Sequence, residues 1–215
     1  MNIVLKELFV DIGNVSIIRD VSFDVPDKSF TCLVGPNGSG KTTILKAIVG
    51  EITEYRGYIS ETILGKLSYL PQNLEVPPFL SVLDVVRTGF YGRPGTKLGV
   101  LESVDDLLYQ CGIYPLREMT FADISVGEQQ RTWLAFALAQ DRGLILMDEP
   151  LSSVDIESRR GFYRLLKDVN QTDKTLLVVT HDIDMVMEFA DKIIYLDGGI
   201  KKFEGAPNAF SQWYR

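Results

Sequence analysis

The most informative segment of the sequence is Gly35-Pro36-Asn37-Gly38-Ser39-Gly40-Lys41-Thr42-Thr43. An apolar run at residues 30–34 precedes it and an apolar-periodic segment at residues 44–49 follows it, which predicts a strand, a glycine-rich loop and the start of a helix. The loop matches G-x-x-x-x-G-K-[ST], in which backbone N–H groups surround a phosphate and the helix N-terminus adds a positive dipole. We therefore expect the whole stretch to bind a nucleoside triphosphate, with Lys41 at the outer phosphates and Thr42 as a ligand for Mg²⁺.

The composition and charge are those of a folded globular chain. Hydrophobic residues make up 46% and charged residues 24% of its 215 residues, which fits one compact domain. A net charge of −7 argues against a nucleic-acid partner, because a phosphate backbone requires a basic face. No segment approaches the roughly 18 consecutive apolar residues of a membrane span, and Cys32 and Cys111 suggest no disulfide framework. We expect a soluble, cytoplasmic chain.

Apolar runs of strand length recur along the chain. Nearly uninterrupted runs lie at residues 31–34, 67–70, 144–147 and 176–179. Such runs are typical of strands buried on both faces of a parallel sheet. Residues 4–10 and 17–25 flank Gly13-Asn14 and predict an N-terminal antiparallel hairpin, and residues 193–203 predict a second hairpin. The predicted fold class is α/β, with a parallel sheet and an antiparallel N-terminal sheet.

The middle third of the chain shows no buried strand between Gln72 and Asp141. Its apolar spacing predicts helices over residues 82–88, 101–111 and 126–140, with a Gly/Pro-punctuated loop over residues 89–99. We interpret residues 76–140 as a helical insertion. The core of the single domain would then comprise residues 1–75 and 141–215.

Two acidic residues end the apolar run at residues 144–147 and precede Pro150. Taken alone, Asp148 and Glu149 are explained by a strand that stops at a solvated turn. The carboxyl ends of parallel strands are, however, where α/β sheets bind ligands, and a phosphate loop lies upstream. We therefore expect Asp148 to hold Mg²⁺ through water and Glu149 to activate a water for attack on the γ-phosphate.

Two further polar residues follow predicted strands. His181 is the one histidine of the chain, and a lone histidine is commonly a surface or helix-capping residue. Because its strand should lie beside the others, we expect it to reach the edge that holds Lys41 and Glu149 and to donate a hydrogen bond to the γ-phosphate. Gln72 could orient water or contact Mg²⁺, although an exposed loop amide is the simpler explanation of its position.

The segment Ile124-Ser125-Val126-Gly127-Glu128 opens the helix predicted at residues 126–140. Ser125 and Glu128 have the spacing of a capping box, which by itself explains a helix start. A serine beside free N–H groups at a helix N-terminus also makes a phosphate site. The two interpretations are compatible, and a second anion site suggests that two chains face each other.

Taken together, these motifs resemble those of the nucleotide-binding subunit of an ATP-binding cassette transporter, over about residues 4–207. Residues 35–43 match the Walker A motif, residues 124–128 the signature motif and residues 144–149 the Walker B motif. Gln72 matches the Q-loop, His181 the switch histidine, and Ser152-Ser153-Val154-Asp155 the D-loop. The signature motif separates this family from other P-loop ATPases.

The resemblance implies a P-loop NTPase core with a helical insertion, and ATP with Mg²⁺ as ligands. A head-to-tail homodimer would hold two ATP molecules between the Walker A motif of one subunit and Ser125, Gly127 and Glu128 of the other, next to Asp155. Glu149 would be the general base, with Gln72 and His181 as further catalytic residues and Thr42, Gln72 and Asp148 around the metal.

The resemblance also implies partners. Hydrolysis would drive solute import through separate integral-membrane permease subunits, with this chain on the cytoplasmic face of the membrane. An extracytoplasmic solute-binding protein could act through the permease. Residues 82–86 and 89–93 are similar to importers of zinc, manganese or iron chelates, so the predicted solute is a metal ion or a metal chelate.

Two positions depart from the family pattern. Val126 replaces a glycine of the signature, and its Cβ restricts the backbone beside the second nucleotide. Ile12 stands where the family carries an aromatic residue that stacks on adenine, with Phe9 as a nearby substitute. Two alternative functions stay open: a cytosolic ATP-binding cassette ATPase without a permease, and a degenerate cassette that binds nucleotide as a regulatory module.

Overall fold

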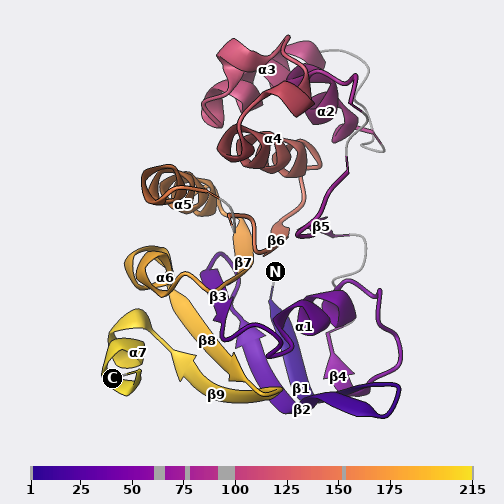
Figure 1. The fold of residues 1–215 in the computed structure, drawn as a ribbon, viewed down its shortest axis with the longest axis vertical. Helices are drawn as coiled ribbons and strands as arrows, with labels where there is room; N and C mark the ends of the chain where they lie inside the picture. Colours follow the sequence, from indigo (N-terminus) through magenta and orange to yellow (C-terminus); the bar gives the residue numbers. More distant parts are fainter. Residues whose placement is uncertain (1, 61–65, 76–77, 92–99, 152–153, 215) are drawn as a thin grey trace.

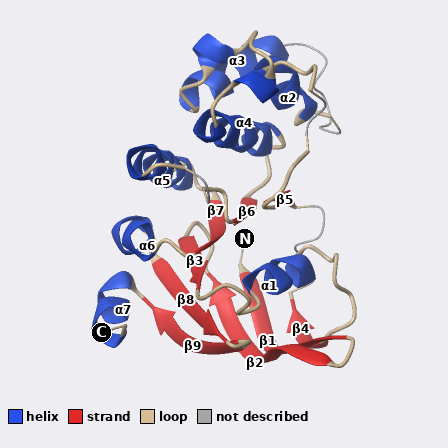
Figure 2. Ribbon diagram, viewed as in Figure 1, coloured by secondary structure: helices blue, strands red, loops and turns tan. Residues whose placement is uncertain are grey.

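Two β-sheets and the helices around them make up the described part of the chain (Figures 1 and 2). The computed structural model describes residues 2–60, 66–75, 78–91, 100–151 and 154–214, and of residues 100–102 only the backbone. In this part the larger sheet has the strand order β5-β6-β7-β3-β8-β9, and the smaller sheet has the order β2-β1-β4. Both sheets are of the kinds that the sequence predicts.

The strands of the larger sheet run parallel from β5 to β8, and β9 is antiparallel to β8. They are β3 (Phe30–Val34), β5 (Leu67–Leu70), β6 (Leu144–Asp148), β7 (Thr175–Thr180), β8 (Lys192–Asp197) and β9 (Ile200–Gly205). Alternate residues enter two different cores: Cys32 packs into one and Leu33 into the other. Burial on both faces explains why the apolar runs are nearly uninterrupted.

The smaller sheet is the predicted N-terminal hairpin with one strand more. β1 (Ile3–Ile12) pairs with β2 (Val15–Val25), and β1 also pairs with β4 (Arg56–Ile59). β4 is short and mostly exposed, so it carries no hydrophobic pattern. Its Gly57 lies so close to β1 that a Cβ would stand 2.2 Å from the carbonyl oxygen of Glu7. β4 is therefore a strand because it pairs with β1, and its own sequence did not predict it.

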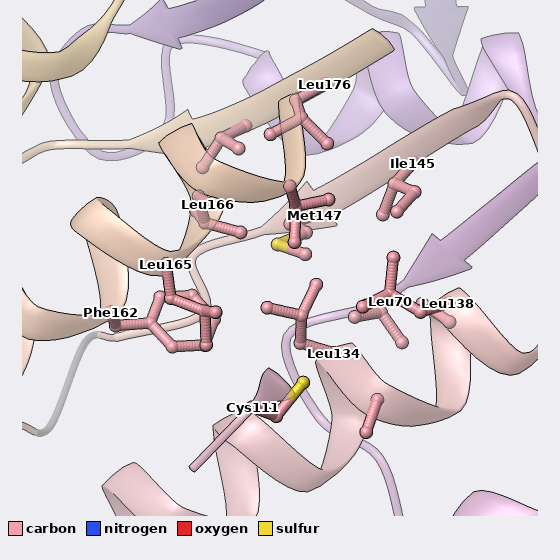
Figure 3. Close-up of a cluster of buried hydrophobic side chains, with 14 of the residues drawn as sticks. Leu70, Cys111, Leu134, Leu138, Ile145, Met147, Phe162, Leu165, Leu166 and Leu176 are labelled. Atoms are coloured by element: carbon pink, nitrogen blue, oxygen red, sulfur yellow. The ribbon is translucent and has the colours of Figure 1, made fainter. Parts of the chain in front are cut away.

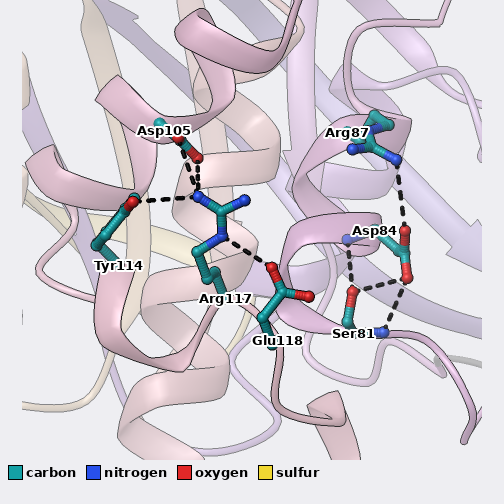
Figure 4. Close-up of polar contacts among 7 residues, drawn as sticks. All are labelled: Ser81, Asp84, Arg87, Asp105, Tyr114, Arg117 and Glu118. Carbon is teal, nitrogen blue, oxygen red and sulfur yellow. Dashed lines mark hydrogen bonds and ion pairs between the residues drawn. The ribbon is translucent and has the colours of Figure 1, made fainter.

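The middle third is helical, as predicted. Its helices are α2 (Val82–Thr88), α3 (Val100–Gln110) and α4 (Val126–Ala139). Two local networks hold this part together (Figure 4). Ser81 and Asp84 form a capping box at the start of α2. Arg117 donates to both carboxylate oxygens of Asp105 at 3.0 Å and to the hydroxyl of Tyr114 at 3.2 Å, which joins α3 to the segment after it.

A continuous hydrophobic cluster joins these helices to the larger sheet (Figure 3). Leu134 and Leu138 on α4 pack with Met147 on β6 and Leu70 on β5. Helix α5 (Ile156–Asn170) contributes Phe162, Leu165 and Leu166 to the same cluster. The larger sheet is therefore anchored to the helical part through shared core residues, which fixes how α4 is presented beside α5.

The remaining helices flank the larger sheet. They are α1 (Lys41–Ile48), α6 (Ile183–Phe189) and α7 (Pro207–Trp213). Residues 92–99 of the predicted loop, and Ser152-Ser153 of the predicted D-loop, lie outside the described residues. Within the described residues, no helix combines the length and the apolar character that crossing a bilayer requires.

Candidate functional site

Four neighbouring strands of the larger sheet end at one edge, and each is followed by residues singled out from the sequence. Gln72 follows β5, Glu149 follows β6, His181 follows β7, and residues 35–43 follow β3. Because these strands are parallel, their carboxyl ends lie together. Groups that are far apart along the chain are thereby brought to one place.

A cavity of about 470 Å³ opens at this edge. That volume lies within the roughly 300–1,000 Å³ typical of small-ligand pockets. Its lining residues are Ile17, Asn37, Gly38, Gly40, Lys41, Thr42, Thr43, Gln72 and Glu149. The structure thus brings the glycine-rich loop, Gln72 and Glu149 to one cavity.

Glycines give the loop its shape. Gly38 and Gly40 have φ angles of 76° and 99°, in the left-handed region that side chains with a Cβ rarely adopt. A Cβ on Gly40 would stand 2.4 Å from Cδ1 of Ile18 in β2, and a Cβ on Gly35 would stand 1.9 Å from the carbonyl oxygen of Leu196 in β8. The loop therefore needs glycine for its backbone angles and for its close approach to β2 and β8.

The turn between β8 and β9 is hydrogen-bonded to the glycine-rich loop and to β2. Gly199 donates its N–H to the carbonyl oxygen of Ser39 at 3.1 Å, and the Gly199 carbonyl accepts from the N–H of Arg19 at 2.8 Å. A Cβ on Gly199 would stand 2.1 Å from the carbonyl oxygen of Ile17. The sequence indicated Gly198-Gly199 only as a hairpin turn. That it ties the phosphate loop to β2 is decided by the tertiary structure.

The Lys41 ammonium is held inside the loop. Its Nζ donates to the carbonyl oxygens of Gly35 and Pro36, at 2.9 Å each. The residue is 4% exposed. Burial lowers the pKa of Lys41, while the nearby carboxylates of Glu149 and Asp148 act in the opposite direction. The positive charge of Lys41 is thus already in place at the N-terminus of helix α1.

Asp148 is a buried acid that lacks a full set of partners. It is 2% exposed, and its Oδ1 has no hydrogen-bond partner among the described residues. Burial raises the pKa of Asp148, and a hydrogen bond with the Thr42 hydroxyl opposes that rise. An unpartnered carboxylate oxygen beside a hydroxyl is the oxygen-donor chemistry that Mg²⁺ prefers, so these residues fit that cation.

Glu149 is held in a strained conformation beside His181. Its φ angle is 46°, a left-handed value that costs a non-glycine residue about 1–3 kcal/mol. Its N–H donates to the carbonyl oxygen of Val179 in β7 at 2.9 Å. Oε2 of Glu149 lies 3.6 Å from Nδ1 of His181, which is longer than a hydrogen bond. Strained backbone angles such as that of Glu149 are commonly found at functional sites, where a side chain must point toward a ligand.

The family profile for ABC transporters matches residues 18–152 of this chain. The chain belongs to the ABC transporter family. It is the ATP-binding subunit of a transporter and an ATPase. The matched residues contain the glycine-rich loop, Gln72, the signature segment and Glu149.

Several ABC transporter subunits are similar along most of the chain. The manganese transport system ATP-binding protein MntB of Bacillus subtilis is 34% identical over 208 residues, which cover 87% of this chain and 82% of MntB. The zinc import ATP-binding protein ZnuC of Cereibacter sphaeroides is 32% identical over 210 residues, which cover 97% of this chain and 84% of ZnuC.

Solved ABC transporter structures share the fold. An inward-facing ABC transporter described as of the metal-chelate type is 25% identical, with a TM-score of 0.85 over 97% of this chain and 84% of that chain. The parallel core sheet, the antiparallel N-terminal sheet and the helical insertion are therefore the architecture of an ABC ATPase.

The signature segment of this ABC subunit lies apart from its phosphate loop. Ser125 caps α4, accepting from the N–H of Glu128, while the Glu128 carboxylate accepts from the N–H of Ser125 at 2.8 Å. A Cβ on Gly127 would meet Val154 at 3.8 Å, beside the start of α5. The cavity at the phosphate loop has no lining residue from this segment in the part of the chain that the structure describes. Val126, the first residue of α4, is 46% exposed.

Asp155 is also not among the described residues that line the cavity at the phosphate loop. Its carboxylate caps α5 by accepting from the N–H of Ser158 at 3.0 Å. That hydrogen bond holds the pKa of Asp155 below its usual range. Asp155 is exposed and follows Val154, which lies beside Gly127 of the signature segment. The exposed residues Ser125, Val126 and Asp155 therefore form a second group on the surface.

Ile17, and not Ile12, reaches the cavity from the N-terminal hairpin. Ile12 is 54% exposed and lies at the end of β1, beside the hairpin turn. Phe9 packs instead under the guanidinium of Arg56, 4.8 Å from its ring centre. Ile17 escaped prediction because the direction of a side chain on a hairpin depends on register, and β1 and β2 have several register shifts.

Proposed function

We propose that this chain is one half of a composite ATPase in which a second copy completes each ATP site. The observation that carries this proposal is the separation of the two groups described above. The cavity at the phosphate loop contains Lys41, Gln72 and Glu149, whereas Ser125 and Gly127 lie at the start of α4. A head-to-tail pair would place the exposed N-terminus of α4 of one copy over the phosphate loop of the other.

In this proposal the phosphate loop and α1 bind the triphosphate. Residues 35–43 surround the phosphates with backbone N–H groups, and Lys41 exchanges its two carbonyl partners for phosphate oxygens. Thr42 and Asp148 would hold Mg²⁺, with Gln72 at the edge of the cavity as a further contact. That cation, when bound, neutralises charge on the phosphates.

The strand-end residues perform the hydrolysis. Glu149 accepts the proton of the attacking water, because its carboxylate borders the cavity and is 15% exposed. His181, whose side chain is 52% exposed and lies 3.6 Å from that of Glu149, would donate a hydrogen bond to the γ-phosphate. Ser125 and Gly127 of the second copy would bind the same phosphate from the opposite side, with Asp155 beside them.

The permease would dock at the groove beside Gln72. A cavity of about 430 Å³ separates the end of β5 from the helical part, and its lining includes Gln72, Phe121 and Trp133. Because Gln72 borders both this groove and the nucleotide cavity, a partner in the groove can sense the nucleotide. This arrangement treats residues 76–140 as a helical insertion into the core, on the cytoplasmic face of the membrane.

The proposed solute is a metal ion or a metal chelate. Support comes from relatives whose names describe manganese transport and zinc import, at 34% and 32% identity. Import would require permease subunits, and a solute-binding protein outside the cell could deliver the solute to them.

Glu149→Gln tests the composite site. The variant keeps the shape of the side chain but cannot accept a proton, so ATP should still bind while turnover falls by at least about a hundredfold. Size-exclusion chromatography with light scattering should then show a dimer in ATP and a monomer without it. Unchanged turnover would refute the role of Glu149, and a monomer in ATP would refute the composite site.

The solute is tested with the purified transporter. The chain is expressed with the permease subunits that co-purify with it, and the complex is placed in vesicles with the ATPase side outward. Release of enclosed Mn²⁺ or Zn²⁺ is followed after ATP is added outside and, as a control, with ATP omitted; ATP-driven uptake is followed in vesicles of the opposite orientation that enclose ATP. Uptake that depends on ATP and is lost in Glu149→Gln supports metal import; ATP turnover without movement of either metal would overturn it.

A further inference from the structure

Arg159 links two segments that border the candidate site. It lies in the first turns of α5, and its side chain is 27% exposed. Its Nε and Nη2 donate to the carbonyl oxygen of Val154, at 3.2 and 2.7 Å. Its Nη1 donates to Oδ2 of Asp182 at 2.8 Å. One guanidinium therefore joins the D-loop backbone to the residue that follows His181.

Asp182 is itself firmly placed. Its side chain is 14% exposed and caps α6 by accepting from the N–H of Met185 at 3.3 Å. Its own N–H donates to the Thr180 hydroxyl at 3.1 Å. His181 thus lies between two residues that are held by hydrogen bonds, with its own side chain 52% exposed. Rotation of the His181 backbone is restricted by these bonds and by the ion pair between Asp182 and Arg159.

The other end of the link lies beside the signature segment. Val154, whose carbonyl oxygen binds Arg159, is so near Gly127 at the start of α4 that a Cβ on Gly127 would stand 3.8 Å from its side chain. Between Arg159 and Glu149 lies a cavity of about 10 Å³, which is lined also by His181 and Tyr163. So small a space holds at most about one water molecule, and it places Arg159 on the same cavity as Glu149 and His181.

We propose that Arg159 is a positioning residue that holds His181 against Glu149 and ties both to the surface offered to the second copy. This inference rests on the proposed function, because it gives His181 a role in hydrolysis and the signature segment a role in the partner's site. Arg159 has no place in the lining of the nucleotide cavity, so it acts through His181 and Val154. Its planar guanidinium suits this task, because it supplies three N–H donors in fixed directions.

Arg159→Ala should separate kcat from KM. Loss of the link leaves the phosphate loop intact, so we expect KM for ATP to change by no more than about twofold. A misplacement of His181 by about 1 Å should lower kcat by roughly ten- to a hundredfold. The dependence of turnover on ATP concentration should also lose cooperativity, because the link joins the two sites of the dimer.

Arg160→Ala is the matched control. Arg160 is the next residue of α5 and also pairs with α6, through hydrogen bonds of 3.1 and 3.0 Å to Glu188. Arg160→Ala therefore shows how much stability is lost when an ion pair between the same two helices is removed and the site residues are left unchanged. Arg159→Lys keeps the charge but cannot hold Val154 and Asp182 together, so it should resemble Arg159→Ala in kcat.

A purely structural role predicts a different pattern. In that case Arg159→Ala and Arg160→Ala would lower the melting temperature alike, and each would keep its kcat when measured well below that temperature. A kcat for Arg159→Ala within about twofold of that for Arg160→Ala would overturn the inference. Failure of the proposed function is distinguishable, because it would appear in the wild-type chain or in Glu149→Gln as missing turnover or a missing ATP-dependent dimer.

Discussion

At the scale of single residues, the site is organised for binding at some cost to stability. Glu149 keeps a left-handed backbone angle, and Lys41 and Asp148 are buried charges. The Lys41 ammonium is satisfied by two carbonyl oxygens, whereas Oδ1 of Asp148 has no partner in the described structure. Buried groups that are poorly satisfied destabilise a fold and are retained where a ligand will complete them.

Asp148→Asn should therefore stabilise the chain while it abolishes hydrolysis. Burial raises the pKa of Asp148 above its usual range, so the ionised carboxylate costs stability at any pH above that raised value. The gain from the amide is fully present at neutral pH and disappears as pH falls below the ordinary pKa of about 3.8. In the absence of nucleotide and divalent cations, the melting temperature at pH 7 should rise by a few degrees.

Asp106→Asn, at an exposed position on α3, is the control for loss of one negative charge. It should leave both the melting temperature and turnover unchanged. A melting temperature for Asp148→Asn at or below that of the wild type would show that Asp148 is better satisfied than its unpartnered oxygen indicates.

At the scale of elements, helix starts are specified by local hydrogen bonds. Ser125 and Glu128 have capping-box spacing in the sequence, and the structure has both bonds. The same motif occurs at Ser81 and Asp84, where Oδ2 of Asp84 also accepts from the Ser81 hydroxyl at 2.7 Å (Figure 4). One motif thus caps α4, which presents the signature, and α2, which packs against it.

Asp84→Asn should weaken α2 in a pH-dependent manner. The hydrogen bond from Ser81 holds the pKa of Asp84 below its usual range, so its stabilisation is present above about 3.8 and is lost as pH falls through the lowered pKa. At pH 7 the loss should be about 0.5–1 kcal/mol in the free energy of unfolding, the usual worth of a cap. Urea unfolding at a series of pH values from about 7 to about 2, which extends below the lowered pKa, measures the difference.

Asp106→Asn serves again as the reference for Asp84→Asn, since it also removes one carboxylate from the helical part. A pH-independent difference between wild type and Asp84→Asn would mean that the hydrogen bond, and not the charge, supplies the stabilisation.

At the scale of the whole molecule, a second copy is required for a complete site under the proposed function. Lys41→Ala removes the phosphate-loop cation, and Ser125→Asp keeps a good helix cap while it places a negative charge at the signature. Each variant alone should be inactive as a homodimer. In a 1:1 mixture half of the dimers are mixed, and each mixed dimer has one intact site, so turnover should recover to at most about a quarter of the wild-type value, and to less where the two sites are cooperative.

The control mixture combines Lys41→Ala with the double variant Lys41→Ala/Ser125→Asp, which allows no intact site in any pairing. A site contained within one chain predicts no recovery in either mixture. ATPase assays over a range of total protein concentration would separate the two possibilities.

Much of the fold could be predicted because local pattern and global position agree in this chain. The strands β3, β5, β6 and β7 of the larger sheet contain nearly uninterrupted apolar runs, and the helix α2 lies at residues 82–88 as its spacing indicates. β4 escaped prediction because Arg56-Gly57-Tyr58-Ile59 has no buried face of its own until β1 lies beside it. Such strands are specified by pairing, and pairing is not a local property.

The chain's order of residues is enough to predict a phosphate loop, an acidic strand end and a capped signature helix, because each depends on residues that are neighbours along the chain. Three contacts could not be predicted in that way: Ile17 lines the cavity, Gly199 supports the loop, and Arg159 joins Val154 to Asp182. These contacts depend on strand order and register, which bring segments separated along the chain to the same sheet edge. The number of residues between two segments does not show how close those segments lie in the folded chain.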